Sequence, residues 1–332
     1  MLCTLNVFFF DTKYNLVWKV DKLGKVLMMT MELSEQSSSC VSICQLAEAV
    51  GMPAEAIGKL RSAWDEGLGT RLNENNAAGL IRELSVGERA ESAWQELETL
   101  LRAGNDEGWK ILAAMLDAGA GPTLARYRAE GIGEDVFIAT MGAFSRFVEE
   151  SKVRYGSYRF DRAFWTWRQT SLRIFRLGAL EYETTKGMET PACILEAGGL
   201  TEPVRAVSVH IPSDADLSPA AVDASLSAWH EFAMRHRRQW ADASLWCESW
   251  LLAPALERLL PPNSRILAFQ RRFSIVQVHA DAPDWREWIF DCNPSPIAEL
   301  PEDTALRRTA KRYLLGGGSI GVGVGVLRTA RR

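Results

Sequence analysis

The chain has 332 residues, of which 47% are hydrophobic and 24% charged, and this globular composition contains no run near the roughly 18 uninterrupted apolar residues of a membrane-spanning helix. The length predicts two domains, or one domain with a large extension. The net charge of −4 is split into 14 basic and 22 acidic residues over 1–150 and 24 basic and 20 acidic residues over 151–332, so neither half has the strongly basic face expected of nucleic-acid binding.

Residues 1–36 are interpreted as a disordered or misassigned N-terminal extension. The opening MLCTLNVFFFDTKYNLVWKV lacks the basic start of a secretion signal, and Asp11 and Lys13 cut its apolar run to about seven residues. The segment MELSEQSSS, from Met31, has the polar character of a natural start. We therefore expect a cytoplasmic protein.

A helical domain is predicted over residues 37–153. Apolar residues recur three and four positions apart in several segments, and glycine, proline or asparagine separates most of them. These segments are CVSICQLAEAVGM, AAGLIRELSV, ESAWQELETLLRA, EGWKILAAMLDA and EDVFIATMGAFSRFVEE. The absence of a fixed repeat period argues against a solenoid.

Helices and strands are predicted to alternate over residues 154–332. FDRAFWTWRQTSLRIFRLG is expected to be a helix that ends at Gly178, followed by the strands ALEYETT, PACILEA and VRAVSVHIP. In SDADLSPAAVDASLSAWHEFAMRHR, Ser218 is a suitable N-cap and Pro219 suits the first helical position.

The remaining elements continue this mixed pattern. SLWCESW is a predicted strand and LLAPALERLLPP a short helix. SRILAFQRRFSIVQVHA and WREWIFD are predicted to form an antiparallel pair around a turn from Asp281 to Asp284, and TALRRTAKRYLL is a final helix.

The glycine-rich run LLGGGSIGVGVGVL is unlike a phosphate-binding loop, because too few residues follow it to form the helix that such a loop precedes. Its alternation places Gly321, Gly323 and Gly325 on one strand face and valines on the other. A bare glycine face permits close approach of either a packed neighbour or a ligand, and we favour packing.

The order of elements in the second half resembles that of GNAT acyltransferases. The segments FDRAFWTWRQTSLRIFRLGALEYE, VHIPSDADLSP, ESWLLAPALERLLPPNSRILAFQ and LLGGGSIGVGVGVL together resemble two-domain acyltransferases with a helical N-terminal domain and a GNAT-like C-terminal domain. The resemblance extends from about residue 40 onward and implies an α+β fold, in which a mixed β-sheet with flanking helices follows the helical domain.

The resemblance also implies a site for a coenzyme A thioester. In GNAT enzymes two neighbouring strands splay apart, the pantetheine arm fills the gap like an added strand, and the pyrophosphate binds at the N-terminus of the next helix. The corresponding segments here are 205–211, 212–217 and the helix from Ser218. The residues expected to bind the donor are Val209, Ile211, Ser213, Leu217, Ser218 and Arg168, although Arg168 could instead pair with Asp161 or Glu181.

The predicted donor loop departs from the GNAT pattern. IPSDADLSP contains no glycine and carries Asp214 and Asp216, whose carboxylates would repel a pyrophosphate. This departure supports an alternative hypothesis, in which the GNAT-like domain is a non-catalytic module that binds a ligand or a protein.

Acyl transfer from a thioester to an amine requires a general base. Glu181 and Glu183 share one face of a predicted strand, and His210 ends the strand expected to hold the donor; each is a candidate base. Glu248 is expected to face either the reaction site or solvent. For the glutamates, ordinary surface positions are the alternative, and for His210 it is a loop-anchoring hydrogen bond.

Other reactive residues give weaker signals. Cys247 could act as a nucleophile, but a buried inert thiol is the favoured interpretation, and Tyr182 or Tyr313 could protonate a thiolate. The six cysteines and four histidines lack metal-ligand spacing, so no metal is expected.

The sequence thus predicts a direct N-acyltransferase that uses coenzyme A thioesters and a small-molecule amine acceptor, with no nucleic-acid or membrane partner. An acyl carrier protein is a second possible donor. Its docking patch would include Arg235, Arg237 and Arg238, although such a run is commonly only a solvated helix end.

Overall fold

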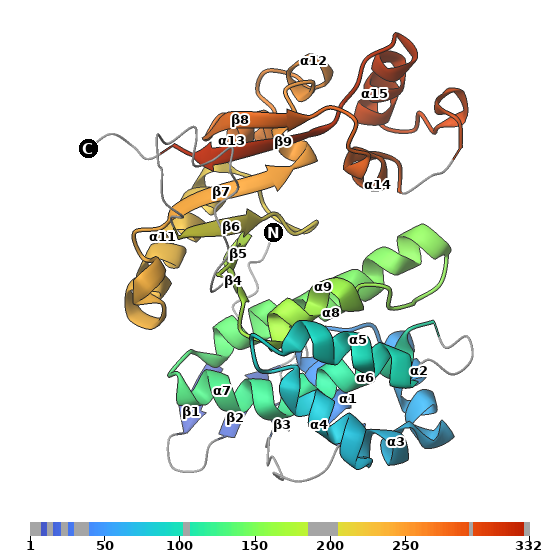
Figure 1. Ribbon diagram of the computed structural model, residues 1–332, viewed down its shortest axis with the longest axis vertical. Coiled ribbons are helices and arrows are strands. Elements are labelled where there is room, and N and C mark those ends of the chain that lie inside the picture. The colour runs from blue at the N-terminus through green and yellow to red at the C-terminus, as the bar shows by residue number, and fades with distance from the viewer. Residues whose placement is uncertain are drawn as a thin grey trace.

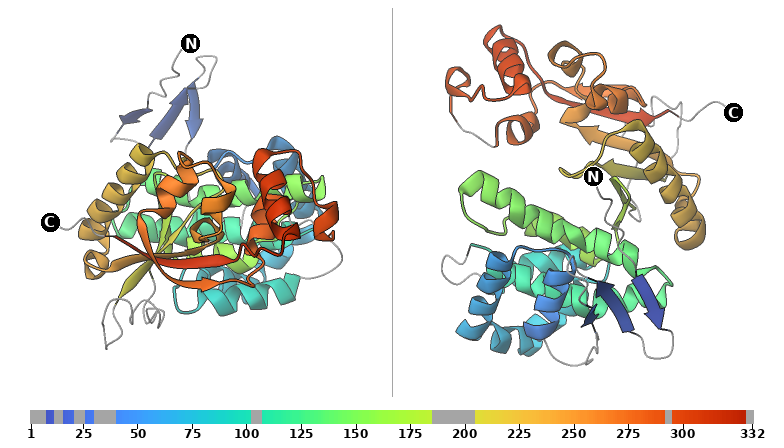
Figure 2. Two further views of the ribbon diagram at one scale, coloured as in Figure 1. Left: turned by 90° about the horizontal axis from the view of Figure 1, so that it is seen from above. Right: turned by 180° about the vertical axis from the view of Figure 1, so that it is seen from behind.

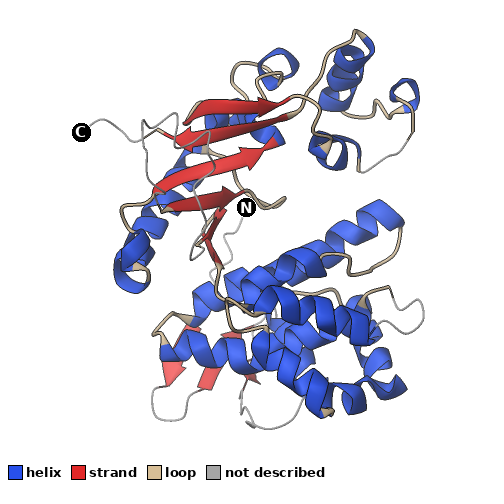
Figure 3. Ribbon diagram, in the orientation of Figure 1, coloured by secondary structure: helices blue, strands red, loops and turns tan. Residues whose placement is uncertain are grey.

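The computed structural model describes residues 8–11, 16–20, 26–29, 40–101, 107–184, 205–291 and 295–328. A helical unit is followed by a mixed six-stranded sheet with flanking helices, as predicted (Figure 3). In Figure 1 the helical unit is at the bottom and the sheet is above it.

The helical unit confirms all five helices that periodicity predicted. Helix α6 is apolar on nearly all sides and is almost completely buried, as expected of a central helix. The helices are α1 (Cys40–Ala49), α2 (Ala54–Ala63), α3 (Gly69–Asn73), α4 (Asn75–Glu83), α5 (Ala90–Leu101), α6 (Trp109–Ala118), α7 (Leu124–Ala129), α8 (Glu134–Tyr155) and α9 (Ala163–Thr170).

Helix α8 belongs to the helical unit and packs against the sheet. Acidic residues in its first turn and basic residues in its last turn complement the helix dipole, and Gly156, with a φ of 72°, ends it. Strand β4 (Ile174–Leu177) lies along it, and the backbone N–H of Arg176 donates to Thr140 Oγ1. The predicted domain boundary at 153/154 falls inside α8, whereas the first strand of the sheet begins at Ile174.

The sheet has the strand order β4-β5-β6-β7-β9-β8. All neighbouring pairs are antiparallel except β6 and β7, which are parallel. The remaining strands are β5 (Leu180–Glu183), β6 (Ala206–His210), β7 (Ser244–Ser249), β8 (Phe273–His279) and β9 (Val322–Leu327).

The helices that surround the sheet are α11 (Pro219–His236), α12 (Leu256–Leu259), α13 (Arg265–Gln270), α14 (Asp284–Phe290) and α15 (Ala305–Leu315). Ser218 caps α11 as predicted, by accepting a hydrogen bond from the backbone N–H of Ala221. Helix α11 packs on β5, where the hydroxyls of Ser225 and Tyr182 lie 3.0 Å apart. Figure 2 shows α11 from two further sides.

The predicted helix over residues 160–178 is wrong in its second half. Helix α9 ends at Thr170, Leu172 has a φ of 60°, and β4 follows. Ile174, Phe175 and Leu177 are all buried, so the strand is a nearly continuous apolar run, and periodicity cannot distinguish such a run from a buried helix.

The predicted pairing of SRILAFQRRFSIVQVHA with WREWIFD is also wrong. Strand β8 pairs with β9, and WREWIFD forms helix α14. Trp285, Ile289 and Phe290 are buried at helical spacing, and Pro283 precedes the first turn, as is common at helix starts. The predicted strand PACILEA lies outside the described residues.

The glycine strand packs closely, as predicted. A Cβ atom at Gly323 would lie 2.3 Å from the carbonyl oxygen of Leu252, and one at Gly325 would lie 3.0 Å from Phe273 Cβ. Gly321 has a φ of 70° and passes close to the backbone of His279. The glycines therefore admit neighbouring chain segments.

One hydrophobic core runs through both units, from α1 to β8, and a second cluster joins α12 to α15. Residues 1–36, interpreted above as an extension, contain a separate antiparallel sheet of β1 (Phe8–Asp11), β2 (Leu16–Val20) and β3 (Val26–Met29). Within the described ranges, no helix is long and apolar enough to cross a membrane.

Candidate active site

Strand β6 separates from strand β7 near its end. The two strands pair only from Ala206 opposite Ser244 to Ser208 opposite Trp246. Strand β6 continues to His210 and β7 to Ser249, and over the described residues no further pairing joins them. As predicted, a gap opens where the facing edges of β6 and β7 are no longer paired with each other, although β6 still pairs with β5 and β7 with β9 on their other edges.

A pocket of about 560 Å³ lies at this gap. Strand β6 and the following loop contribute Val209, His210 and Ile211, and β7 contributes Glu248. The lining also includes Glu181 of β5, the 212–217 loop, residues 249–251, Ile266 of α13 and residues of α8, α9 and α14, so both units of the protein form the pocket.

His210 and Glu183 form a hydrogen-bonded pair at this pocket. Glu183 lies opposite Ser208 on the neighbouring strand, which places its side chain on the same sheet face as that of His210. His210 Nε2 lies 2.9 Å from Glu183 Oε2. Because an ionised carboxylate only accepts hydrogen bonds, Nε2 carries the proton and Nδ1 is the basic nitrogen.

Two arginines help to keep Glu183 ionised. Its Oε1 atom lies 3.1 Å from Arg168 Nε and 3.5 Å from Arg173 Nη2. Burial by itself raises the pKa of Glu183, but the hydrogen bond from His210 and the charges of His210, Arg168 and Arg173 outweigh it and lower the pKa to about 2. The carboxylate can therefore orient His210 and stabilise its protonated form.

Glu181 has a different partner. It lies directly opposite His210 in the β5–β6 register, yet its Oε1 atom accepts a hydrogen bond of 2.8 Å from Arg146 Nη2 of helix α8. Both side chains are buried, at 3% and 8% exposure. Burial lowers the pKa of Arg146, but Glu181, Asp214 and Glu150 outweigh it and raise the pKa.

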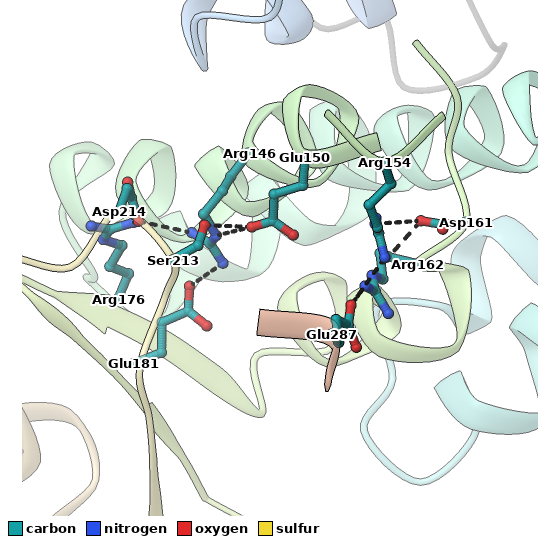
Figure 4. A network of polar contacts seen from close by, with 10 residues as sticks. All are labelled: Arg146, Glu150, Arg154, Asp161, Arg162, Arg176, Glu181, Ser213, Asp214 and Glu287. Atoms are coloured by element: carbon teal, nitrogen blue, oxygen red, sulfur yellow. Dashed lines mark hydrogen bonds and ion pairs between the residues drawn. The ribbon is translucent and has the colours of Figure 1, made fainter. Parts of the chain in front are cut away.

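Arg146 also fastens the predicted donor loop to α8 (Figure 4). Its Nη1 atom lies 3.7 Å from Asp214, and its Nε atom lies 3.9 Å from Glu150, which accepts a hydrogen bond from Ser213. The loop that follows β6 is thereby held against the helical unit.

A second group of ion pairs joins α14 to the helical unit (Figure 4). Glu287 lies 3.0 Å from Arg154 Nη1 and also pairs with Arg162. Arg154 lies 3.2 Å from Asp161 as well. These contacts place α14 beside the C-terminal end of α8, where it forms one wall of the pocket.

Comparison with protein families assigns both units. Residues 42–172 match the N-acyltransferase N-terminal domain, and residues 174–327 match the GNAT-like C-terminal domain. The chain belongs to this family of two-domain N-acyltransferases. The resemblance seen in the sequence is thus confirmed. None of the curated proteins matches the chain.

Solved acyltransferase structures share the fold of this family member. An acyltransferase in complex with decanoyl-CoA and teicoplanin has 20% sequence identity to this chain and a TM-score of 0.67. The match covers 85% of this chain and 86% of that chain. A mutant in complex with octanoyl-CoA is 19% identical over 90% and 91% of the two chains, with a TM-score of 0.69. A complex with CoA and 10C-teicoplanin is 19% identical over 90% of each chain, with a TM-score of 0.68.

The two acids of the predicted donor loop are compensated within the protein. Arg176 Nη1 donates to both oxygens of Asp214, at 2.8 and 2.9 Å. Asp216 accepts hydrogen bonds from the backbone and hydroxyl of Ser218, which lower its pKa, and it lies 3.2 Å from Arg265 Nη1. The repulsion expected from the sequence is therefore reduced.

The predicted donor-binding residues fall into two groups. Val209, Ile211, Ser213 and Leu217 line the pocket. Ser218 caps α11, and Arg168 is engaged with Glu183 while lying 4.5 Å from the centre of the Trp165 ring. Neither of the partners proposed for Arg168 from the sequence, Asp161 and Glu181, is the observed one.

The other predicted reactive residues also have defined places. Glu248 lines the pocket with its side chain 49% exposed. Cys247 is completely buried, which raises its pKa and favours the inert interpretation. Tyr182 is buried against α11, and burial raises its pKa. Tyr313 packs on the second hydrophobic cluster. Among the described residues, no group of acids, cysteines and histidines could hold a metal.

Arg146 and Glu287 are pocket residues that are not predicted from the sequence. Arg146 does carry a local signal, because it stands between Phe144 and Phe147 in a predicted helix, and a basic residue among buried positions implies a charged partner. Glu287 lies in WREWIFD, which is predicted to be a strand. The sequence therefore gives no corresponding signal of a buried partner for this residue.

Proposed function

We propose that this protein transfers an acyl group directly from a coenzyme A thioester to an amine of a small-molecule acceptor. The observation that carries the proposal is the gap between β6 and β7, which opens at the pocket beside the His210–Glu183 pair. Acyltransferases of the same fold have been crystallised with CoA, octanoyl-CoA and decanoyl-CoA, and one of them with teicoplanin, which supports this donor and a small-molecule acceptor.

The donor is proposed to lie along the open edge of β6. The pantetheine amides would pair with backbone groups near Val209, and Ile211 and Leu217 supply apolar lining. The phosphates would lie near the 212–217 loop. Arg265, which is 71% exposed, provides a cation close to this loop.

His210 is the proposed general base. Its Nδ1 takes a proton from the acceptor ammonium, and the neutral amine attacks the thioester carbonyl carbon. The attacking nitrogen of the tetrahedral intermediate releases a second proton to solvent, and the intermediate breaks its C–S bond, so the neutral amide forms and the thiolate leaves. Protonated His210 returns its proton to the thiolate, while Glu183 stabilises the imidazolium between the two transfers.

The other candidate bases are less suited to this role. Glu181 is engaged with Arg146, and accepting a proton would break a buried ion pair. Free coenzyme A is preferred to an acyl carrier protein because Arg237, in the middle of the predicted docking patch, lies 2.7 Å from Glu130 and packs over Phe175.

Thermal unfolding with acetyl-, octanoyl- and decanoyl-CoA, followed by thiol release with a panel of amines, tests the proposal. A donor at one hundred times its dissociation constant should stabilise the protein by about 2.7 kcal/mol. Free pantetheine is the matched control for the proposed phosphate contacts, because it has the arm of coenzyme A but lacks the phosphates. Lack of stabilisation by every thioester would overturn the proposal, whereas donor binding without turnover on any amine would favour the non-catalytic module.

A further inference from the structure

The pocket has an excess of negative charge. Among the described residues, its lining includes the carboxylates of Glu150, Glu181, Glu248, Asp284 and Glu287, but only two arginines, Arg146 and Arg162. The amine substrate of the proposed reaction is positively charged before it reacts, so the position of each uncompensated carboxylate bears on the acceptor's chemistry.

Both pocket arginines already have carboxylate partners. Arg146 is bound to Glu181, and Arg162 is bound to Glu287, which also lies 3.0 Å from Arg154. Glu150 accepts a hydrogen bond from Ser213, and its nearest cation is Arg146 at 3.9 Å. These three glutamates are therefore at least partly neutralised.

Glu248 and Asp284 have no such compensation. The nearest basic side chain to Glu248 is that of His279, whose Nε2 lies 3.7 Å away, and both side chains are more than 40% exposed. Asp284 lies in the first turn of α14, and no lysine or arginine of the described chain pairs with it. The pocket can accommodate added positive charge at these two side chains.

The α14 wall is remote from the proposed donor loop. Arg146, which holds the loop, and Arg154, which holds α14, are eight residues apart on α8, a separation of about 12 Å along the helix (Figure 4). The donor loop and Asp284 thus lie toward opposite ends of the pocket.

Two exposed aromatic side chains add a second cation-binding feature. Trp288 lies one helical turn after Asp284 on α14 and is 40% exposed, and Phe164 of α9 is 48% exposed; both line the pocket. Cations are attracted to aromatic ring faces, so an acid and a tryptophan on one helix face suit an ammonium group.

A carboxylate beside the reacting amine would oppose catalysis, because a nearby negative charge favours the ammonium form, which cannot attack. Carboxylates remote from the donor loop are instead suited to an ammonium that does not react. We propose that the acceptor carries a second cationic group, as in a diamine or an aminosugar with two amino groups, and that Asp284 binds this group while His210 deprotonates the other.

This inference rests on the proposed acyl transfer, and a matched pair of acceptors tests it separately. With octanoyl-CoA as donor, thiol release and product mass are measured for 1-aminohexane and 1,6-diaminohexane. We expect kcat/KM to be roughly tenfold higher for the diamine. This factor corresponds to the combined binding free energy of a partly exposed ion pair and a cation–π contact. The preference should fall as salt is raised.

The test variant is Asp284→Asn, with Glu257→Gln on the exposed face of α12 as the control. Asp284→Asn should lose most of the diamine preference through KM, while Glu257→Gln should retain it. Unchanged stabilisation by octanoyl-CoA in each variant verifies that the donor site is folded.

The possible outcomes separate the two proposals. Equal use of the two amines by the unmodified protein, or a preference that survives Asp284→Asn, overturns the second-cation inference and leaves acyl transfer standing. Donor stabilisation without turnover of either amine, or of any wider panel, overturns acyl transfer and this inference together.

Discussion

Strand β7 has a neighbour on each side, and the two junctions are built differently. Its pairing with β9 continues from Trp246 to Ser249, and glycines in β9 let the chain around Leu252 pack against it. Its pairing with β6 ends at Trp246, and beyond that point the pocket begins. The sheet is closed where small residues permit close packing and open where polar side chains gather.

The polar groups at the open junction come from several elements. His210 ends β6, Glu183 belongs to β5, and Arg146 reaches the sheet from α8. Among the described residues, no comparable set of buried charged side chains lies beside β9. We infer that the open junction serves chemistry and the closed junction serves stability, and substitutions on each side should separate the two roles.

The largest expected effect is at the open junction. His210→Ala should lower kcat by roughly 10²- to 10⁴-fold, the usual contribution of a general base. Single-turnover measurements with octanoyl-CoA and an accepted amine would give this value. Donor stabilisation should persist, because the side chain is proposed to act on the acceptor. Retention of more than a tenth of the activity would remove His210 from the mechanism.

Glu183→Gln should have the next largest effect, a loss of kcat on the order of 100-fold, because the amide can hold His210 but cannot stabilise its charge. The same change should alter the dependence of stability on pH. The pKa of Glu183 is lowered to about 2, so its ionised form contributes stability that is fully present above the ordinary carboxyl pKa of 4.5.

This contribution is lost as the pH falls from about 4.5 toward 2. Chemical unfolding should therefore be measured for the unmodified protein and for Glu183→Gln. The difference between their unfolding free energies should become smaller as the pH falls from about 4.5 toward 2. A difference that stays constant with pH would show that the charge of Glu183 does not stabilise the fold.

The smallest effect on activity is expected at the closed junction. Gly323→Ala places a Cβ atom 2.3 Å from the carbonyl oxygen of Leu252, and the required backbone shift should cost about 1–3 kcal/mol of stability. The kcat of the folded variant should change little. Gly58→Ala, on the exposed side of α2 with open space around it, is the control and should stabilise the protein by about 0.5–1 kcal/mol.

Local signals predicted much of this fold. Apolar spacing identified the long helices, Ser218 and Pro219 located the start of α11, and strict alternation identified the glycine strand. The predicted gap beside His210 came from the order of elements in a resembling family, because no local pattern states where two strands diverge.

The failures have a common physical cause. Ile174–Leu177 and Asp284–Phe290 are short segments, in which too few apolar residues occur for their spacing to distinguish a strand from a helix. The partners of Glu181 and Glu287 are 35 and 125 residues away in the sequence, at Arg146 and Arg162, and only the docking of α8 and α14 brings them together. Candidate bases could be named from the sequence, but their counterions could not.

The two groups of ion pairs along α8 also limit the construction of chimaeras, in which the helical unit of one protein is joined to the GNAT-like unit of another. Arg146 and Arg154 come from the helical unit, whereas Glu181 and Glu287 come from the GNAT-like unit. A chimaera that joins this helical unit to the sheet of another relative would leave a buried guanidinium without its carboxylate, at a cost of roughly 3–5 kcal/mol. Exchange of modules at residue 173 should therefore succeed only when these acidic and basic positions are transplanted as matched sets.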